Sequence, residues 1–214
     1  MEITRRRREC DVLVVGGGPA GSTIAALLAQ KRRHVVVLEK DRFPRFHIGE
    51  SLLPLNLPLF ERLGVLEQVK RIGVYKPGAE VVSDEHPHAA IFRFDQNPYL
   101  SIDHSYHVRR ADFDKLLIDN SRRLGATVLE DARVTEIEFG AQGRSRVTAL
   151  GPDKMASLWF PRFVVDASGR DTLLLRRLGL RRVDKRNNTA AVFGHFRNVF
   201  HTKQCTGHDH DASV

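Results

Sequence analysis

The chain has 214 residues, with 34 Lys and Arg against 26 Asp and Glu and a formal net charge of +8. A composition of 42% hydrophobic and 28% charged residues is typical of a globular protein and excludes a mostly disordered chain. Two cysteines, Cys10 and Cys205, exclude a disulfide scaffold and favour a reducing, cytoplasmic compartment. We expect no membrane span, because no apolar run approaches ~20 residues. We expect no signal peptide, because no apolar h-region with a cleavage site follows the charged N-terminus.

Basic residues gather at 5–8 and at 170–186. Clusters of this kind are one signature of nucleic-acid binding. No recognition-helix motif, zinc-finger spacing or aromatic-rich sheet motif accompanies them. We therefore expect a solvated basic surface that attracts a polyanionic cofactor, and no nucleic-acid partner.

The N-terminal segment predicts one βαβ unit. Residues 11–15 are a short apolar run typical of a buried parallel strand, and GGGPAG follows at 16–21. A helix is predicted over 22–33, with cations in its last turn, and a second strand over 34–38. The apolar face of this helix is expected to consist of Ile24, Leu27 and Leu28. Such alternation predicts a parallel sheet with a right-handed crossover.

The next part of the chain begins with a long irregular stretch at 40–54. Loops of this length inside a compact domain are usually functional or disordered, and its apolar content favours function. Two short helices are predicted over 56–63 and 65–72, each followed by a glycine. Residues 74–108 are punctuated by prolines and predict short strands, and a further helix is predicted over 111–124.

A series of strands follows this helix. Three pieces are predicted at 126–129, 134–139 and 145–150, and two more at 156–160 and 162–166. The last piece is a buried strand that ends in an Asp and a turn of small residues. Beyond residue 188, AAVFGHF is compatible with a strand, and polar residues follow.

The glycines after the first strand carry the clearest functional signal. Gly16, Gly18 and Gly21 follow a strand and open a helix, and Glu39 ends the next strand. In this motif the first glycine permits a tight turn, the second lets the backbone approach a pyrophosphate, and the third permits close helix packing. The helix N-terminus then offers N–H groups to the phosphates. An acid at Glu39 favours FAD or NAD over NADP.

The chain resembles the flavin-dependent halogenases, within the superfamily of FAD-dependent monooxygenases and geranylgeranyl reductase-like enzymes. The resemblance covers essentially the whole chain, as the N-terminal portion of such an enzyme. It rests on VGGGPAG at 15–21, VLEK at 37–40, FPRFHIGESLLP at 43–54, VRR with FD at 108–114, and VDASGR at 165–170.

The resemblance implies the residues that contact FAD. The pyrophosphate would lie against Gly16, Gly18, Pro19, Ala20 and Gly21, and the adenosine ribose against Glu39, with Lys40 beside it. The flavin ring would lie beside Gly49, Glu50 and Ser51, and further contacts would come from Arg110, Asp166 and Gly169. Adjacent Arg109 leaves the arginine ambiguous by one position. Arg110 could instead be a surface cation, and Asp166 could form an Asx turn.

Lys76 corresponds in this resemblance to the catalytic amine of the halogenases. Reduced flavin and oxygen convert a halide to hypohalous acid there, and a lysine in a dry pocket holds the halogen for transfer to an aromatic carbon. Burial would lower the pKa of such an amine. The alternative is a surface lysine in a Pro/Gly turn.

The resemblance implies an α/β fold: a Rossmann-like FAD/NAD(P)-binding domain, with a parallel sheet and a β-meander, and an incomplete β-rich substrate domain. We expect the FAD-binding domain over 1–72 and 106–180, and the substrate-side region over 73–105 and 181–214. Downstream halogenase segments have no counterpart in this sequence, so we expect a truncated fragment that is inactive alone.

The implied function is FADH2-dependent halogenation of a phenol- or pyrrole-type aromatic in secondary metabolism. The implied substrate is free or carrier-protein-bound, and a separate flavin reductase would supply FADH2. The alternatives are an FAD-dependent monooxygenase, a prenyl or alkene reductase, and an inactive FAD-binding remnant. The 41–51 loop lacks the cysteine common in prenyl reductases, which favours a halogenase.

No metal site is expected. Adjacent ligands in HDHD at 208–211 more often belong to a solvated polar segment than to a metal centre. His47 could act as a general base, but a packed loop histidine is the simpler interpretation.

Overall fold

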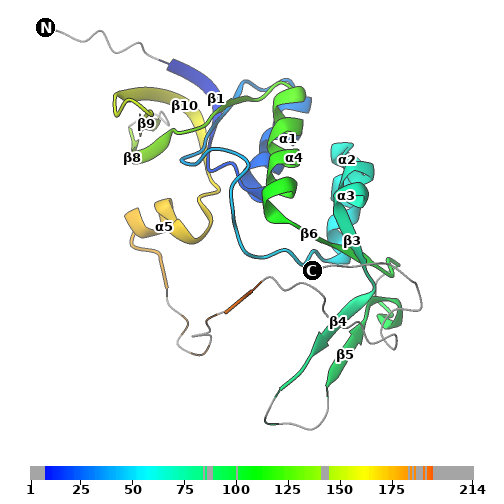
Figure 1. The fold of residues 1–214 in the computed structure, drawn as a ribbon. Coiled ribbons are helices and arrows are strands. Elements are labelled where there is room, and N and C mark those ends of the chain that lie inside the picture. The colour runs from blue at the N-terminus through cyan, green and yellow to red at the C-terminus, as the bar shows by residue number, and fades with distance from the viewer. Residues whose placement is uncertain are drawn as a thin grey trace, which may run out of the picture.

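The computed structural model describes residues 8–83, 85, 89–99, 101–140, 145–182, 184, 186, 190 and 192–194. The fold is α/β, as predicted, with a six-stranded sheet in the order β7-β2-β1-β10-β9-β8 (Figure 1). Strands β7, β2, β1 and β10 run parallel, and β8 and β9 continue the sheet from β10 as an antiparallel meander. The strand bounds are β1 (Arg8–Val15), β2 (Val35–Leu38), β7 (Thr127–Leu129), β8 (Arg133–Phe139), β9 (Ser145–Leu150) and β10 (Ala156–Asp166).

Strand β10 corrects the expectation of two separate pieces at 156–160 and 162–166. It is one strand of 11 residues. Its first part pairs with β9 up to Trp159, and its second part pairs with β1 from Trp159 onward. Pro161 lies beyond the last residue paired with β9, so its missing N–H removes no hydrogen bond from that ladder. The strand therefore joins the meander to the parallel sheet.

Helix α1 (Pro19–Gln30) starts and ends earlier than the predicted 22–33. The chain turns after Gln30, where Arg32 adopts a φ of +56° and donates its N–H to the carbonyl of Ala29. Lys31, Arg32 and Arg33 therefore follow the helix instead of occupying its last turn. The most deeply buried face is also not the predicted one, because small side chains allow the helix to approach the sheet closely. That face consists of Gly21, Ser22, Ala25, Ala26 and Ala29.

The two faces of the sheet are covered differently. Helices α1 and α4 (Arg110–Arg123) lie side by side and pack on one face, where Val14, Val37 and Ile118 are fully buried. The meander curls over the other face, where Leu13 and Val147 are fully buried. Both layers thus exclude water from the parallel strands, as buried parallel sheets require.

Helices α2 (Leu57–Leu63) and α3 (Leu66–Ile72) confirm the two predicted short helices to within two residues. Gly64 ends α2 in the left-handed region, with a φ of +71°. The two helices pack against α4 and strand β6 (Ser105–Val108) in a second hydrophobic cluster. Leu52, from the irregular stretch that follows β2, packs against the same cluster.

Two small antiparallel sheets lie outside the large one. Strand β3 (Gly73–Lys76) pairs with β6 (Ser105–Val108), and β4 (Gly78–Val81) pairs with β5 (Ala90–Arg93) in a hairpin that extends away from the helices (Figure 1). Helix α5 (Leu173–Arg177) follows the turn after β10. The short 3-10 turns are Pro54–Asn56, Phe94–Gln96 and Gly169–Asp171.

The predicted strand near 190 is not observed at residues 190 and 192–194, which have no regular structure. The rest of that prediction, and most of 181–214, lies outside the described residues. Within the described part of the chain, no helix combines the length and apolar character needed to cross a membrane.

Candidate cofactor site

The glycine turn after β1 brings three backbone segments into contact. Gly16 has a φ of +98°, and a Cβ there would lie 2.5 Å from the carbonyl oxygen of Ala167 in the turn after β10. A Cβ at Gly21 would lie 1.9 Å from the carbonyl oxygen of Gly16. Gly18 is the N-cap of α1, where no side chain caps the helix. The turn therefore leaves a bare helix N-terminus of the kind that accommodates a diphosphate.

Glu39 lies at the end of β2 with its side chain almost fully buried, 3% exposed. Its Oε2 accepts the N–H of Gly17 at 2.6 Å, and its Oε1 accepts the N–H of Asp41 at 2.9 Å. These two hydrogen bonds fix the Glu39 carboxylate beside the glycine turn. Its remaining lone pairs are the acceptors that a ribose hydroxyl requires.

A cavity of about 510 Å³ opens at this edge of the sheet. Eight of the predicted residues line it: Gly16, Gly18, Pro19, Ala20, Glu39, Lys40, Arg110 and Gly169. Six others do not: Gly21, Gly49, Glu50, Ser51, Lys76 and Asp166. The cationic side chains that line it are Lys40, Arg45, Arg110, Arg133, Arg170 and Arg176. Their excess over the acidic side chains in the wall suits a dianionic pyrophosphate.

Arg45 and Asp114 were not among the residues predicted to contact the cofactor. Arg45 lines the cavity, and its Nη1 lies 3.0 Å from Oδ2 of Asp114, a carboxylate with no exposed surface. Arg110 donates two hydrogen bonds to the same carboxylate, from Nε at 2.8 Å and from Nη2 at 2.9 Å. The four-residue spacing of Arg110 and Asp114 at the start of α4 was a signal for the second pair, although the predicted helix began one residue later, at 111. One buried carboxylate thus orients two guanidinium groups in the cavity wall.

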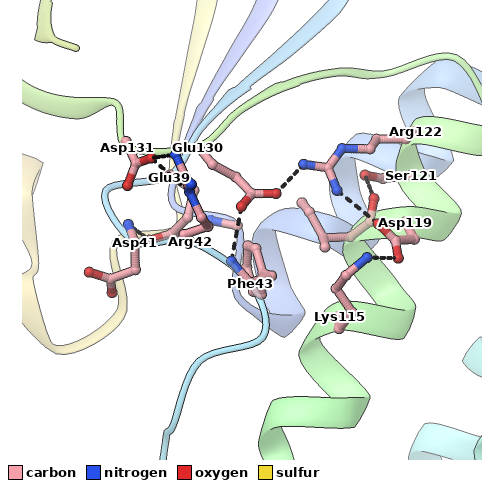
Figure 2. A network of polar contacts seen from close by, with 12 residues as sticks. Glu39, Asp41, Arg42, Phe43, Lys115, Asp119, Ser121, Arg122, Glu130 and Asp131 are labelled. Atoms are coloured by element: carbon pink, nitrogen blue, oxygen red, sulfur yellow. Dashed lines mark hydrogen bonds and ion pairs between the residues drawn. The ribbon is translucent and has the colours of Figure 1, made fainter. Parts of the chain in front are cut away.

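The loop that carries Arg45 contacts the two residues that follow β7, and one of these also contacts α4, as Figure 2 shows. The N–H of Phe43 donates to Oε2 of Glu130 at 2.9 Å, and Arg42 forms an ion pair with Asp131 at 2.5 Å. Glu130 is also paired with Arg122 of α4. These contacts hold the loop that precedes Arg45 against the residues that follow β7.

Arg110 and its neighbour Arg109 lie in different surroundings. Arg109 is 80% exposed and pairs with Asp112, whereas Arg110 lines the cavity. The Nη1 of Arg110 donates to the carbonyl of Ile48 at 3.0 Å, and its backbone N–H donates to Oε1 of Glu50 at 3.3 Å. Arg110 therefore connects the cavity with the loop of Gly49, Glu50 and Ser51.

Asp166 is used within the chain. Its Oδ1 accepts the N–H of Ser168 at 3.0 Å and its Oδ2 accepts the N–H of Leu174 at 2.8 Å. This is the Asx-turn geometry that the sequence left as an alternative. The carboxylate shapes the turn that carries Gly169 and faces Gly16. Nearby, Nζ of Lys40 pairs with Asp171 at 2.5 Å across the cavity mouth.

Lys76 ends β3 and reaches the loop on the far side of Arg110. Its Nζ donates to Oγ of Ser51 at 2.5 Å and to the carbonyl of Leu52 at 3.1 Å. The same nitrogen lies 5.1 Å from the centre of the Phe94 ring. Burial lowers the pKa of Lys76 below its usual 10.5. The side chain is thus held, in contrast to the surface lysine of the alternative interpretation.

His47 lines the cavity, and its pKa is lowered by burial and by the charges of Arg45 and Arg110. Among the described residues, no three His, Cys, Asp or Glu side chains gather as metal ligands. The HDHD segment at 208–211 lies outside the described residues.

Residues 9–213 match the FAD binding domain family. The chain belongs to this family. Its cofactor is FAD, and the glycine turn, Glu39 and the cationic cavity fit that dinucleotide. The FAD-binding chain is 34% identical over 213 residues to a 1H-pyrrole-2-carbonyl-[peptidyl-carrier protein] chlorinase of Pseudomonas fluorescens, covering 92% of this chain and 47% of the relative. It is 33% identical to a tryptophan 2-halogenase of Chondromyces crocatus, covering 88% and 36%.

Solved structures agree with these relatives. The fold matches the flavin-dependent halogenase CmlS with a TM-score of 0.75 and 33% identity, over 83% of this chain and 32% of that one. It matches a flavoprotein/dehydrogenase from Cytophaga hutchinsonii with a TM-score of 0.74 and 35% identity, over 80% and 42%. The FAD-binding chain spans about half or less of the length of the curated relatives it matches.

Proposed function

We propose that this FAD-binding chain is the cofactor-binding part of a flavin-dependent halogenase that acts on an activated aromatic ring. The observation that carries the proposal is the connection between the cavity and Lys76. Arg110 lines the cavity and binds the carbonyl of Ile48, and three residues further along the loop Ser51 binds the Lys76 amine. A reactive amine next to the flavin-side loop is what separates halogen transfer from simple flavin binding.

The proposed reaction consumes reduced flavin, oxygen, a halide ion and the aromatic substrate. Reduced flavin, when bound, supplies the two electrons that let oxygen, a halide and a proton yield hypohalous acid and water. The Lys76 amine holds the hypohalous acid, either by a hydrogen bond or as a haloamine formed with release of water. From hypohalous acid, an aromatic carbon takes the halogen, and its proton leaves with the hydroxide as water. From the haloamine, the aromatic carbon takes the halogen and its proton returns to the Lys76 amine. Burial keeps a larger fraction of Lys76 in the free amine form.

The cavity residues bind and orient the cofactor. Arg45 and Arg110 present their guanidinium groups to the pyrophosphate, and Glu39 accepts from the adenosine ribose. Gly49, Glu50 and Ser51 would hold the flavin ring, with Lys76 on the other side of this loop. In support, Arg45 and Arg110 line the same cavity as the glycine turn. Pre-organised charges of this kind need no rearrangement when the cofactor binds.

The substrate we propose is a pyrrole- or phenol-type ring, carried by a carrier protein or free. Two relatives are named for pyrrole-2-carbonyl groups on a peptidyl-carrier protein, one a chlorinase and one a brominase. A separate flavin reductase would supply the reduced cofactor. We further propose the domain division of the sequence analysis, with the FAD-binding domain over 1–72 and 106–180, and no activity for the chain alone.

The test uses the full-length protein that contains this chain, supplied with reduced flavin, oxygen, bromide or chloride, and pyrrolyl-carrier or phenolic substrates. Halogenated product is detected by its isotope pattern in mass spectrometry. Lys76→Ala should reduce product by more than about 100-fold while FAD still binds. Lys70→Ala, which removes an exposed lysine of α3, is the matched control.

Three outcomes contradict the proposal or part of it. Halide-independent oxygenation or alkene reduction would assign the protein to the alternative enzyme classes. Full activity of Lys76→Ala would exclude the catalytic amine. A chain that does not bind FAD, measured by flavin fluorescence, would indicate an inactive remnant.

A further inference from the structure

The segment Glu50–Leu52 lies beside β6 like a short third strand. The N–H of Val108 donates to the carbonyl of Glu50 at 2.9 Å, and the N–H of Leu52 donates to the carbonyl of Tyr106 at 3.0 Å. Ser51 faces His107 in an antiparallel bridge. On the other side of β6, β3 pairs Val74 with His107. Residue 51, β6 and β3 are therefore in register.

This register puts Ser51 and Lys76 on one face of the small sheet. Ser51, His107 and Val74 are cross-strand partners, so their side chains share a face. Lys76 lies two residues beyond Val74 and shares it as well. From this position Lys76 extends across β6 to the Ser51 hydroxyl, 25 residues away in the chain.

We propose that Ser51 is the positioning residue of Lys76: its hydroxyl holds the lysine amine against the flavin-side loop. This inference rests on the proposed function, since it assigns a partner to the proposed catalytic amine. It explains why a strand-end lysine does not extend into water, which is the usual conformation of the residue.

A hydroxyl is suited to this task because it both accepts and donates. It accepts from Lys76 as an ammonium and donates to Lys76 as a free amine. The Leu52 carbonyl, 3.1 Å from Nζ of Lys76, can only accept a hydrogen bond. It therefore binds Lys76 only through an N–H of the amine or ammonium group. The Phe94 ring, 5.1 Å away, attracts the ammonium form. Ser51 thus holds the side chain in both protonation states.

Among the described residues, the polar side chains of β6 on this face do not compete with Ser51 for Lys76. Ser105, opposite Lys76 on β6, is fully buried, and its Oγ has no hydrogen-bond partner among the described residues. His107 lies 3.7 Å from Glu50 through its Nε2. These two carry the polar groups of β6 on this face, and neither hydrogen-bonds Lys76 in the described part of the chain.

The experiment measures Lys76 directly, on this chain and without cofactor. Trace acetylation with isotope-labelled acetic anhydride, followed by peptide mass spectrometry, gives the reactivity of each lysine as a function of pH. Lys115, a half-exposed lysine of α4 paired with Asp119, is the internal reference. The variants are Ser51→Ala, Ser51→Thr, which keeps a hydroxyl, and Ser101→Ala as an exposed serine control.

Release of Lys76 into water should remove the burial that lowers its pKa. In Ser51→Ala, labelling of Lys76 at pH 8 should fall about threefold relative to Lys115, which corresponds to a pKa rise of about half a unit. Ser51→Thr should restore it, and Ser101→Ala should leave it unchanged. Ser51 itself is exposed, so these variants should fold. An unchanged profile, or a lower pKa, in Ser51→Ala overturns the proposal.

The outcomes separate this inference from the proposed function. If Ser51→Ala shifts the labelling but Lys76→Ala in the full-length protein still halogenates, the positioning stands and the catalytic amine fails. If Lys76→Ala abolishes halogenation and Ser51→Ala leaves the labelling unchanged, the catalytic amine stands and the positioning fails.

Discussion

Arg45 and Asp114 lie 69 residues apart in the chain, and their side chains meet at 3.0 Å beside the cavity that Arg45 lines. The carboxylate has no exposed surface, and Arg110 binds it from the other side. A buried charge with two partners is stabilising only while both remain. Asp114 thus couples the stability of the fold to the charge of the cavity.

Asp114→Ala should therefore destabilise the chain by about 3–5 kcal/mol, because it leaves two guanidinium groups without their buried partner. FAD affinity should fall as both groups lose their orientation. Urea denaturation and flavin fluorescence measure the two effects. Asp112→Ala, which removes the partially exposed partner of Arg109, should cost less than about 1 kcal/mol. Equal losses in the two variants would contradict this account.

Gly21→Ala should prevent the turn, α1 and β1 from packing, since the new Cβ would lie 1.9 Å from the carbonyl oxygen of Gly16. We expect a loss above about 4 kcal/mol and no FAD binding. Gly125→Ala is the matched control, because nothing lies within 4 Å of its Cβ position. Its φ of +107° limits the loss to about 1–3 kcal/mol of backbone strain, and FAD binding should persist. Calorimetry and fluorescence distinguish the two.

Glu39→Gln should weaken both the turn and FAD binding. The carboxylate accepts from Gly17 and Asp41 with its two oxygens, and an amide has only one acceptor oxygen. The variant should lose about 1–3 kcal/mol of stability and about tenfold in FAD affinity. Glu61→Gln, on the exposed side of α2, should change neither. Wild-type FAD affinity in Glu39→Gln would exclude the ribose role.

The buried thiol of Cys10 should make the free energy of unfolding of the chain depend on pH. Burial, with the nearby charge of Asp11, raises the pKa of the thiol from 9.0 to about 11. Between these values the unfolded chain has lost the proton and the folded chain has kept it. The free energy of unfolding should thus fall as pH rises from 9 to 11, by up to about 1.4 kcal/mol per unit.

Urea melts at several pH values measure this slope in a Cys205→Ser background, where Cys10 is the single thiol. Cys10→Ala should remove that part of the slope. A slope that is the same with and without Cys10 would show that the thiol pKa is not raised.

Local patterns predicted much of the fold. The glycine spacing and the Glu39 position identified the βαβ unit, because the chemistry of that turn is encoded within about 25 consecutive residues. The bounds of α1 were wrong, since the turn at Arg32 depends on a left-handed residue that no sequence pattern announced. The two predicted pieces of β10 were one strand because pairing with β9 and with β1 overlaps at Trp159.

Contacts between distant segments could not be predicted. Arg45 and Asp114 belong to a loop and a helix with no shared motif, and only the packed fold brings them together. The contact of Ser51 with Lys76 depends on the register of three strands, which the sequence does not specify. Asp166 was expected to contact the cofactor, and whether it does stays a prediction, because its described hydrogen bonds go to the turn.

The pairing of β1 with β10 has a consequence for synthesis of the chain. Val15 pairs with Asp166, so the first strand and its parallel partner are about 150 residues apart. At 5–20 residues per second, a ribosome needs about 7–30 seconds to make that span. During this time the open edge of β1 is a template for other strands. Nascent chains are therefore most vulnerable to aggregation before residue 166 has emerged.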